Sequence, residues 1–242
     1  MPLEAGGERR LRIAAHNGAP EWGGAEIATS LLLQGLQERG HQVVLYHNRS
    51  LVARHAVRYG LEVRRAYLGG DVALHHALRF AVQLRRLRPD ALIVGTFRKL
   101  WLAAVAARLA GVPVVTRIGL STDLPRNLKY RVVFRRFVAR VITNADDITA
   151  AYRRALPEAP PPIIRTIHKG IRLPPPRRSR EETLDVLDLP AGVPVVGGVG
   201  RLVEQKRFDR LLEAFAFVPP PARLVVVGDG PLRPELETLA RD

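Results

Sequence analysis

The sequence predicts an α/β protein that has one complete, doubly wound domain and the start of a second domain of the same kind. Two observations predict this class. Short apolar runs alternate with amphipathic stretches along nearly the whole chain, which is the pattern of parallel strands joined by helices. Several of these runs break into glycine, as strands do where a loop begins at the ligand-binding edge of such a sheet.

The first domain is predicted to cover residues 1–172. Its apolar runs predict strands at 11–16, 42–46, 61–68, 91–95, 113–117, 140–143 and 163–167. Helices are expected at 23–39, 72–88, 99–110, 126–138 and 145–156, with glycine or proline after the first three of them. Gly40, Pro89 and Gly111 are such stops, because glycine favours a helix end and proline cannot continue the helix.

A linker is expected at 173–190, and the second domain at 191–242. The run Pro174-Pro175-Pro176-Arg177-Arg178 suits neither helix nor strand. Ser179 and Glu182 form a capping box for a short helix that ends near Leu187. Beyond it come a buried strand at 193–199, a helix at 207–218, a buried strand at 223–227 and a helix still running at Asp242. Only about 50 residues are then available, whereas a domain usually has about 100 or more, so we expect this domain to be incomplete.

The composition restricts the classes of function. The net charge is +15 and the pI is about 11.3, which favours polyanionic partners such as nucleic acid, anionic lipid or phosphorylated substrates. Arginine usage that follows from a GC-rich genome explains the excess equally well. The chain has no cysteine, which excludes disulfides, thiolate zinc sites and a cysteine nucleophile. We expect no transmembrane helix, because no run of about 18 apolar residues occurs.

The residues after the strand at 193–199 predict an anion site. Gly197-Gly198-Val199-Gly200 is followed by Arg201 and Lys206, just before a helix. Glycines let the backbone approach a ligand, and a helix N-terminus with two cations favours phosphate. The alternative is a solvated helix edge in which the cations have no ligand.

Three blocks in this region carry a family resemblance. They are Gly200-Arg201-Leu202-Val203-Glu204-Gln205-Lys206, then 208–215, then Leu224-Val225-Val226-Val227-Gly228-Asp229-Gly230-Pro231. With the weaker match Gly23-Gly24-Ala25-Glu26, the chain resembles the retaining GT-B glycosyltransferases of family 4. The resemblance implies a GT-B fold, with a Rossmann-like acceptor-side domain followed by a Rossmann-like nucleotide-sugar domain that is truncated here.

The resemblance also implies the reaction and its residues. A sugar would pass from a nucleotide diphosphate sugar to an acceptor with retained configuration, with neither metal nor cofactor. Arg201 and Lys206 would be catalytic, because cations aimed at developing phosphate charge lower the barrier. The implied donor-binding residues are Gly23, Gly24, Gly200, Arg201, Lys206, Gly228 and Gly230. An alternative for Gly23 and Gly24 is a helix start that packs closely on a strand.

The sequence departs from the family pattern at three places. The family's pair of glutamates, which holds the donor ribose and sugar, would come after Asp242. The loop after the strand at 113–117 reads Arg117-Ile118-Gly119-Leu120 and lacks the family's histidine. Lys169 stands where the family usually has asparagine. Donor identity and turnover by this chain are therefore left open.

A basic stretch at 126–140 suits an anionic surface. Cations alternate there with Leu128, Val132, Phe134 and Phe137 at roughly helical spacing, as in helices that lie on membranes. The predicted acceptor or membrane patch comprises Arg98, Lys99, Arg126, Lys129, Arg131, Arg135 and Arg136. An ordinary packed helix with a solvated outer side is the alternative.

Histidines and acidic pairs elsewhere have simpler interpretations. His16 lies at a strand end, where contact with substrate is the alternative, but a lone histidine is more often structural. The pair His75-His76 lies within a helix and has no partner at metal-ligand spacing, so a structural role is favoured there. Asp146-Asp147 is interpreted as favourable charge at a helix start. The sequence thus predicts a hexosyl-type glycosyltransferase of surface glycan or lipopolysaccharide synthesis, cytoplasmic and peripheral at the inner membrane face. A non-catalytic domain that binds nucleic acid or anionic lipid is the alternative, although no nucleic-acid partner is expected.

Overall fold

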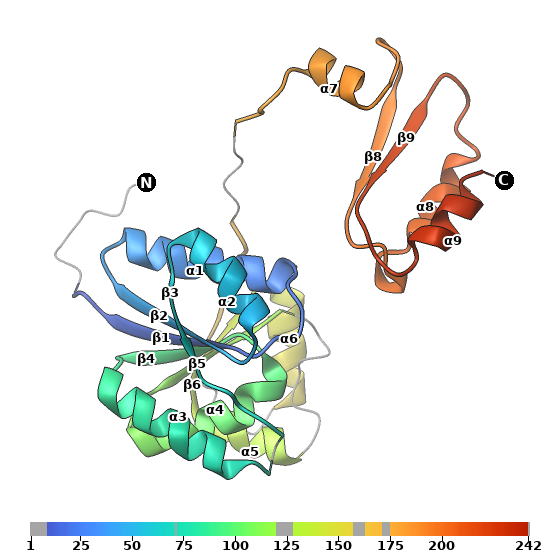
Figure 1. Ribbon diagram of the computed structural model, residues 1–242. Coiled ribbons are helices and arrows are strands. Elements are labelled where there is room, and N and C mark those ends of the chain that lie inside the picture. The colour runs from blue at the N-terminus through green and yellow to red at the C-terminus, as the bar shows by residue number, and fades with distance from the viewer. Residues whose placement is uncertain (1–8, 71, 120–127, 157–162, 171–174, 242) are drawn as a thin grey trace. The chain divides into compact units, whose positions relative to one another are not determined.

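The computed structural model describes residues 9–70, 72–119, 128–156, 163–170 and 175–241. The chain forms two compact units, Met1–Ile171 and Arg172–Asp242, and each is described by itself (Figure 1). Within the described residues, no helix is long and apolar enough to cross a membrane.

The first unit is built on a seven-stranded sheet in which every paired strand is parallel. The strand order is β3-β2-β1-β4-β5-β6-β7, so the winding direction reverses between β1 and β4. In doubly wound sheets, that reversal opens a crevice at the carboxyl ends of the two strands. The strands are β1 Arg12–Asn17, β2 Gln42–His47, β3 Glu62–Arg65, β4 Ala91–Val94, β5 Val114–Ile118, β6 Val138–Thr143 and β7 Ile163–Thr166.

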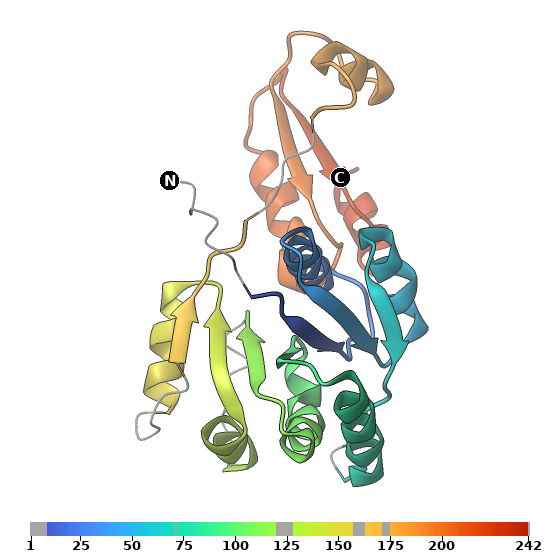
Figure 2. The ribbon, with the colours of Figure 1, turned by 90° about the vertical axis from the view of Figure 1, so that its left-hand side faces the viewer.

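Helices cover both faces of this sheet (Figure 1, Figure 2). One core joins Ile13, Ala15 and Leu45 of the strands to Leu33 and Val52 of α1 and α2. The second core lies on the other face and gathers buried side chains of α3, α4, α5 and α6. The helices are α1 Gly24–Glu38, α2 Ser50–Ala56, α3 Leu74–Leu87, α4 Leu100–Ala110, α5 Leu128–Arg136 and α6 Asp146–Ala155, with short 3₁₀ turns η1 Val57–Tyr59 and η2 Phe97–Lys99.

The predicted doubly wound first unit is confirmed, with several differences of detail, such as a shorter β3 (Glu62–Arg65 against 61–68). The sequence prediction missed α2 and η1, because that helix buries only Val52 and Ala56 and its amphipathic signal is short. Strand β6 begins at Val138 rather than Arg140, because Val138 pairs with Val114 across the sheet. The predicted loop at 157–162 lies outside the described residues.

The second unit contains a two-stranded parallel sheet. Ser179 caps α7 Arg180–Val186, since its Oγ accepts the Glu182 N–H at 3.1 Å and the Glu182 carboxylate accepts the Ser179 N–H at 2.8 Å. This capping box confirms the prediction. The remaining elements are β8 Val195–Val199, η4 Glu204–Lys206, α8 Phe208–Phe215, β9 Arg223–Val227 and α9 Arg233–Leu239. The core of the unit is Leu202, Phe208 and Leu236.

The prediction that both strands of this unit are buried is wrong. Side chains of Val199 and Val227 are 83% and 51% exposed. Helix α8 packs on the face that holds Gly198 and Val226, and because side chains alternate along a strand, Val199 and Val227 point to the opposite face. Val195 and Val225, which share that opposite face, are only partly buried. Helix α9 ends at Leu239, earlier than predicted.

Candidate functional site

The first candidate loop precedes α1 and holds Gly23 and Gly24. The Gly23 N–H donates to the Glu26 carboxylate at 3.1 Å, so Glu26 caps the start of the helix. A Cβ on Gly24 would meet no heavy atom within 4 Å, and one on Gly23 would meet only Glu26, at 3.6 Å. Among the described residues, none packs closely on these glycines, which argues against close packing on a strand, the structural alternative. As the first helical residue, Gly24 has an amide without an acceptor inside the helix.

Hydrogen bonds join the loop after β1 to the loop after β4. Asn17 Oδ1 accepts from the Ala19 N–H at 2.9 Å and from Thr96 Oγ1 at 3.3 Å. Thr96 Oγ1 in turn accepts from the Gly18 N–H at 3.1 Å. These bonds hold the two strand ends together at the place where the winding reverses, which is where ligands bind in sheets of this class.

Arg117 adds a cation to the same edge of the sheet. Its Nη1 donates to Thr29 Oγ1 of α1 at 3.1 Å, and burial lowers its pKa. No described carboxylate lies within ion-pair distance of this guanidinium. A half-buried cation without a carboxylate is costly, so the arrangement favours an anion here. Arg117 was not among the residues predicted for the site, although a cation at the end of a largely apolar strand is a signal that the sequence contains.

His16, at the end of β1, has a structural position. Its side chain is 1% exposed, and its Nε2 lies 3.1 Å from the Ala66 carbonyl oxygen. Burial lowers the pKa of His16 to about 4, so the ring is neutral near pH 7 and can donate from Nε2. The prediction of a structural role is confirmed by this burial.

The second candidate loop joins β8 to α8. Leu202 is buried beside Phe208 and anchors the middle of the loop, while Arg201 and Lys206 are exposed. The Lys206 Cδ lies 4.0 Å from the place that a Cβ on Gly200 would take, so its side chain returns over the glycine. Both predicted cations thus belong to one loop at the carboxyl end of β8.

Gly228 and Gly230 bring the β9 loop against the β8 loop. The Gly200 N–H donates to the Val227 carbonyl at 3.0 Å, and the Leu202 N–H donates to the Asp229 carbonyl at 2.9 Å. A Cβ on Gly228 would overlap the Gly200 carbonyl oxygen, and one on Gly230 would overlap the Leu202 backbone. Backbone contact therefore already requires these two glycines. Their predicted donor contact stays a prediction.

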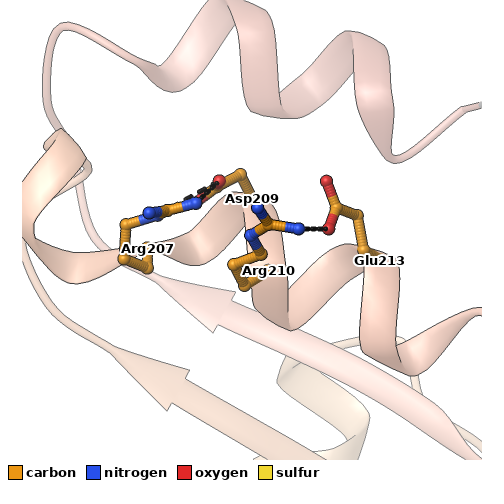
Figure 3. A network of polar contacts seen from close by, with 4 residues as sticks. All are labelled: Arg207, Asp209, Arg210 and Glu213. Atoms are coloured by element: carbon orange, nitrogen blue, oxygen red, sulfur yellow. Dashed lines mark hydrogen bonds and ion pairs between the residues drawn. The ribbon is translucent and has the colours of Figure 1, made fainter.

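Neighbouring cations of this unit are engaged by carboxylates. Arg207 grips Asp209 through two nitrogens, at 2.8 to 3.2 Å, and Arg210 Nη1 bonds Glu213 at 2.8 Å (Figure 3). The bond from Arg207 also lowers the pKa of Asp209. In the described part of the chain, Lys206 has no carboxylate within ion-pair distance. It therefore differs from the arginines that follow it.

In the predicted acceptor or membrane patch, the residues of α5 fall on two faces, one buried and one exposed. Phe134 is fully buried and Phe137 packs against the core, whereas Leu128 is 76% exposed. The outward face holds Leu128, Arg131, Val132 and Arg135, at helical spacing i, i+3, i+4 and i+7. Arg136 is exposed as well.

Other members of the patch lie differently. Lys129 Nζ stands 4.5 Å from the centre of the Tyr130 ring. Lys99 Nζ donates to the Gly69 carbonyl at 2.9 Å, toward the loop before α3. Arg126 lies outside the described residues, as does the side chain of Arg98. No metal-binding group of three or more His, Cys, Asp or Glu residues occurs among the described residues. Whether the two candidate loops meet one ligand stays a prediction.

Comparisons with known proteins agree on the class. The family model Glycosyltransferase Family 4 matches residues 22–174, and Glycosyl transferases group 1 matches residues 179–242. A curated relative, the lipopolysaccharide core biosynthesis glycosyltransferase LpsE of Rhizobium meliloti (strain 1021), is 48% identical over 56 residues, which are 23% of this chain and 16% of that protein.

Solved structures share the fold at low identity. Anabaena Alr3699/HepE in complex with UDP and glucose has a TM-score of 0.74 at 18% identity, over 96% of this chain and 65% of that one. A glycosyltransferase of Rickettsia africae ESF-5 has a TM-score of 0.76 at 14% identity, over 97% of this chain and 64% of that one. The chain therefore spans slightly less than two thirds of these structures. The predicted GT-B fold is confirmed.

Proposed function

The chain belongs to Glycosyltransferase Family 4, and from that premise we propose that it transfers a hexosyl group from a nucleotide diphosphate sugar to a glycan or lipid-linked acceptor. We further propose retention of configuration, without metal or cofactor, and a role in lipopolysaccharide or surface polysaccharide synthesis. The named function of the Rhizobium relative supports the last point, and the UDP and glucose of the Anabaena complex support the donor class.

The loop that joins β8 to α8 carries this proposal. It presents Arg201 and Lys206 beside Gly200, while the arginines that follow are paired with carboxylates. Charge builds on the leaving nucleotide diphosphate as the sugar departs, and cations placed there in advance stabilise it. Lys206, which has no carboxylate partner among the described residues, contributes a point charge, and Arg201 contributes a guanidinium that can bind phosphate oxygens in a fork.

Titration of the 242-residue chain with UDP and with uridine tests the donor site. We expect UDP to bind and uridine to bind far more weakly, because the cations recognise phosphate. Lys206→Ala and Arg201→Ala should each weaken UDP binding by about ten- to a hundredfold, the range for a charge-assisted hydrogen bond. Arg241→Ala, an exposed cation at the other end of the unit, is the matched control. Equal UDP affinity in all four proteins would refute the assignment.

The outward face of α5 supports a second part of the proposal, peripheral attachment to an anionic membrane at the cytoplasmic face. Exposed Leu128 and Val132 share this face with Arg131 and Arg135, and helices with this mixture bind anionic bilayers. Cosedimentation should show binding to vesicles that contain phosphatidylglycerol and none to pure phosphatidylcholine. The double charge reversal Arg135→Glu with Arg136→Glu should abolish it, whereas Arg153→Glu with Arg154→Glu on α6 should not. Preferential binding to a duplex oligonucleotide would instead favour the nucleic-acid alternative.

A further inference from the structure

We propose that a pocket between the end of β3 and α3 binds one anionic sugar unit of the acceptor, a sugar that carries a carboxylate or a phosphate. This rests on the proposed function, because it names the acceptor class. The pocket lies in the first unit and contains neither of the two candidate loops.

The pocket is a formed cavity whose rim is fixed by hydrogen bonds. Its volume is about 350 Å³, near the lower end of ligand pockets (~300–1,000 Å³) and therefore suited to one small ligand. Ala66 is held from both sides, since its N–H donates to the His47 carbonyl and its carbonyl lies 3.1 Å from His16 Nε2. Asn48 bonds both the N–H and the carbonyl of Leu68. The lining residues are Arg65, Ala66, Tyr67, His76, Arg79, Phe80 and Gln83.

The charge of the lining favours an anion. Among the described lining residues, Arg65 and Arg79 are the ionised groups near neutral pH, and no described carboxylate lies within ion-pair distance of either. Arg64, one residue earlier, shows the opposite behaviour and bonds Glu62 at 2.6 Å. Burial lowers the pKa of His76, and the positive charge of Arg79 and Lys99 lowers it further. A carboxylate or phosphate would compensate this local excess of positive charge.

Two residues of the lining each have one buried polar atom that a hydroxyl group can satisfy. Within the described residues, His76 Nδ1 and Gln83 Oε1 are buried and have no hydrogen-bond partner. The other end of the Gln83 amide is used, since Nε2 donates to the Arg65 carbonyl at 3.3 Å. Unpaired buried polar atoms are costly, and a hydroxyl group, which donates and accepts, can satisfy both kinds of partner.

An aromatic ring completes the recognition of a sugar. Tyr67 is 51% exposed, and its ring meets the His76 ring edge-on with centres 4.9 Å apart. A half-exposed ring beside polar groups offers an apolar surface for the carbon-bound hydrogens of a pyranose. Cations, free acceptors and an aromatic face together match a sugar acid or a sugar phosphate better than inorganic phosphate or a neutral sugar.

NMR-detected titration of the full chain without donor tests the pocket, with glucuronate, glucose 1-phosphate, glucose and inorganic phosphate as probes. We expect glucuronate or glucose 1-phosphate to shift the His76 and Gln83 side-chain signals, and glucose and phosphate to bind at least about tenfold more weakly. Arg79→Gln should reduce the affinity for the sugar anion about tenfold. Arg86→Gln, which removes an exposed charge from the same helix, should leave it unchanged, and thermal melts should show both variants folded.

Each other outcome overturns the inference in a definite way. If inorganic phosphate binds as tightly as the sugar anions, the pocket recognises only negative charge. If neither sugar anion binds, the pocket is not a sugar-anion site. The proposed function fails independently, through UDP titration and transfer assays. Transfer activity without sugar-anion binding would refute only the assignment of the pocket. Sugar-anion binding without UDP binding would refute only the assignment of the donor site.

Discussion

The chain contains two glycine-bearing loops at strand ends, and the same residue type is there for opposite physical reasons. In the loop before α1, a Cβ on Gly24 would meet nothing within 4 Å. In the loops after β8 and β9, a Cβ on Gly228 would overlap the carbonyl of Gly200. The second set of glycines is required by the fold itself. The first set leaves the backbone open among the described residues, as Gly70 and Gly197 also do, so its contact with a ligand stays a prediction.

The largest effect should come from adding a methyl group to the second loop. Gly228→Ala forces the two strand-end backbones apart, and backbone cannot yield as a flexible side chain can. We expect it to destabilise the second unit by at least about 3 kcal/mol. Amide hydrogen exchange of β8 and β9 would show the loss of protection.

Gly197→Ala, in the neighbouring strand β8, is the matched control. A Cβ there would meet no heavy atom within 4 Å, so the free energy of unfolding should change by less than about 1 kcal/mol. Both tryptophans, Trp22 and Trp101, belong to the first unit, so their fluorescence should report unchanged unfolding in either variant. Equal protection of β8 in the two variants would show that the close contact is not required.

Lowering the pH should destabilise the first unit through a residue that has no counterpart in the second unit. Burial lowers the pKa of His16 to about 4 from 6.5, so between these values the unfolded chain binds the proton and the folded chain does not. Stability from this residue is therefore complete above pH 6.5 and is lost as the pH falls toward 4. The loss amounts to about 3 kcal/mol.

The second unit contains no histidine, so this contribution belongs to the first unit alone. Urea unfolding followed by tryptophan fluorescence should show decreasing stability of the first unit from pH 7 to pH 4. His16→Gln, which is neutral and retains a donor for the Ala66 carbonyl, should flatten that dependence. An unchanged slope in the variant would assign the acid sensitivity to other groups.

The loop contrast also shows what sequence can predict. The alternation of apolar runs and glycine stops predicted the order of strands and helices, and the capping box at Ser179 was predicted to the residue. The sequence could not distinguish the open Gly24 from the enclosed Gly228, because that difference depends on which backbones cross in three dimensions. Arg117 was not predicted as a site residue for the same reason, since its partner Thr29 is 88 residues away in sequence.

Strand burial in the second unit shows another limit of local pattern. Val199 and Val227 end apolar runs typical of a buried strand, yet both are exposed. An apolar run reports that a strand can be covered on both faces, but burial requires another element on each face. The pocket at the end of β3 was missed because Arg65, His76 and Gln83 come from two separate elements and share no motif.

The smallest effect on stability, and the most informative about ligand, should come from Gly24→Ala. A methyl group there meets open space at the first residue of α1, and alanine suits a helix better than glycine, so stability should rise by up to about 1 kcal/mol. If the bare backbone serves the nucleotide sugar or acceptor, transfer should nevertheless fall about tenfold or more. Gly70→Ala, which also enters open space in the first unit, should change neither quantity appreciably. If Gly24→Ala leaves transfer unaltered, the open backbone at Gly24 does not contact a ligand. The two loops would then differ only in how tightly their glycines pack.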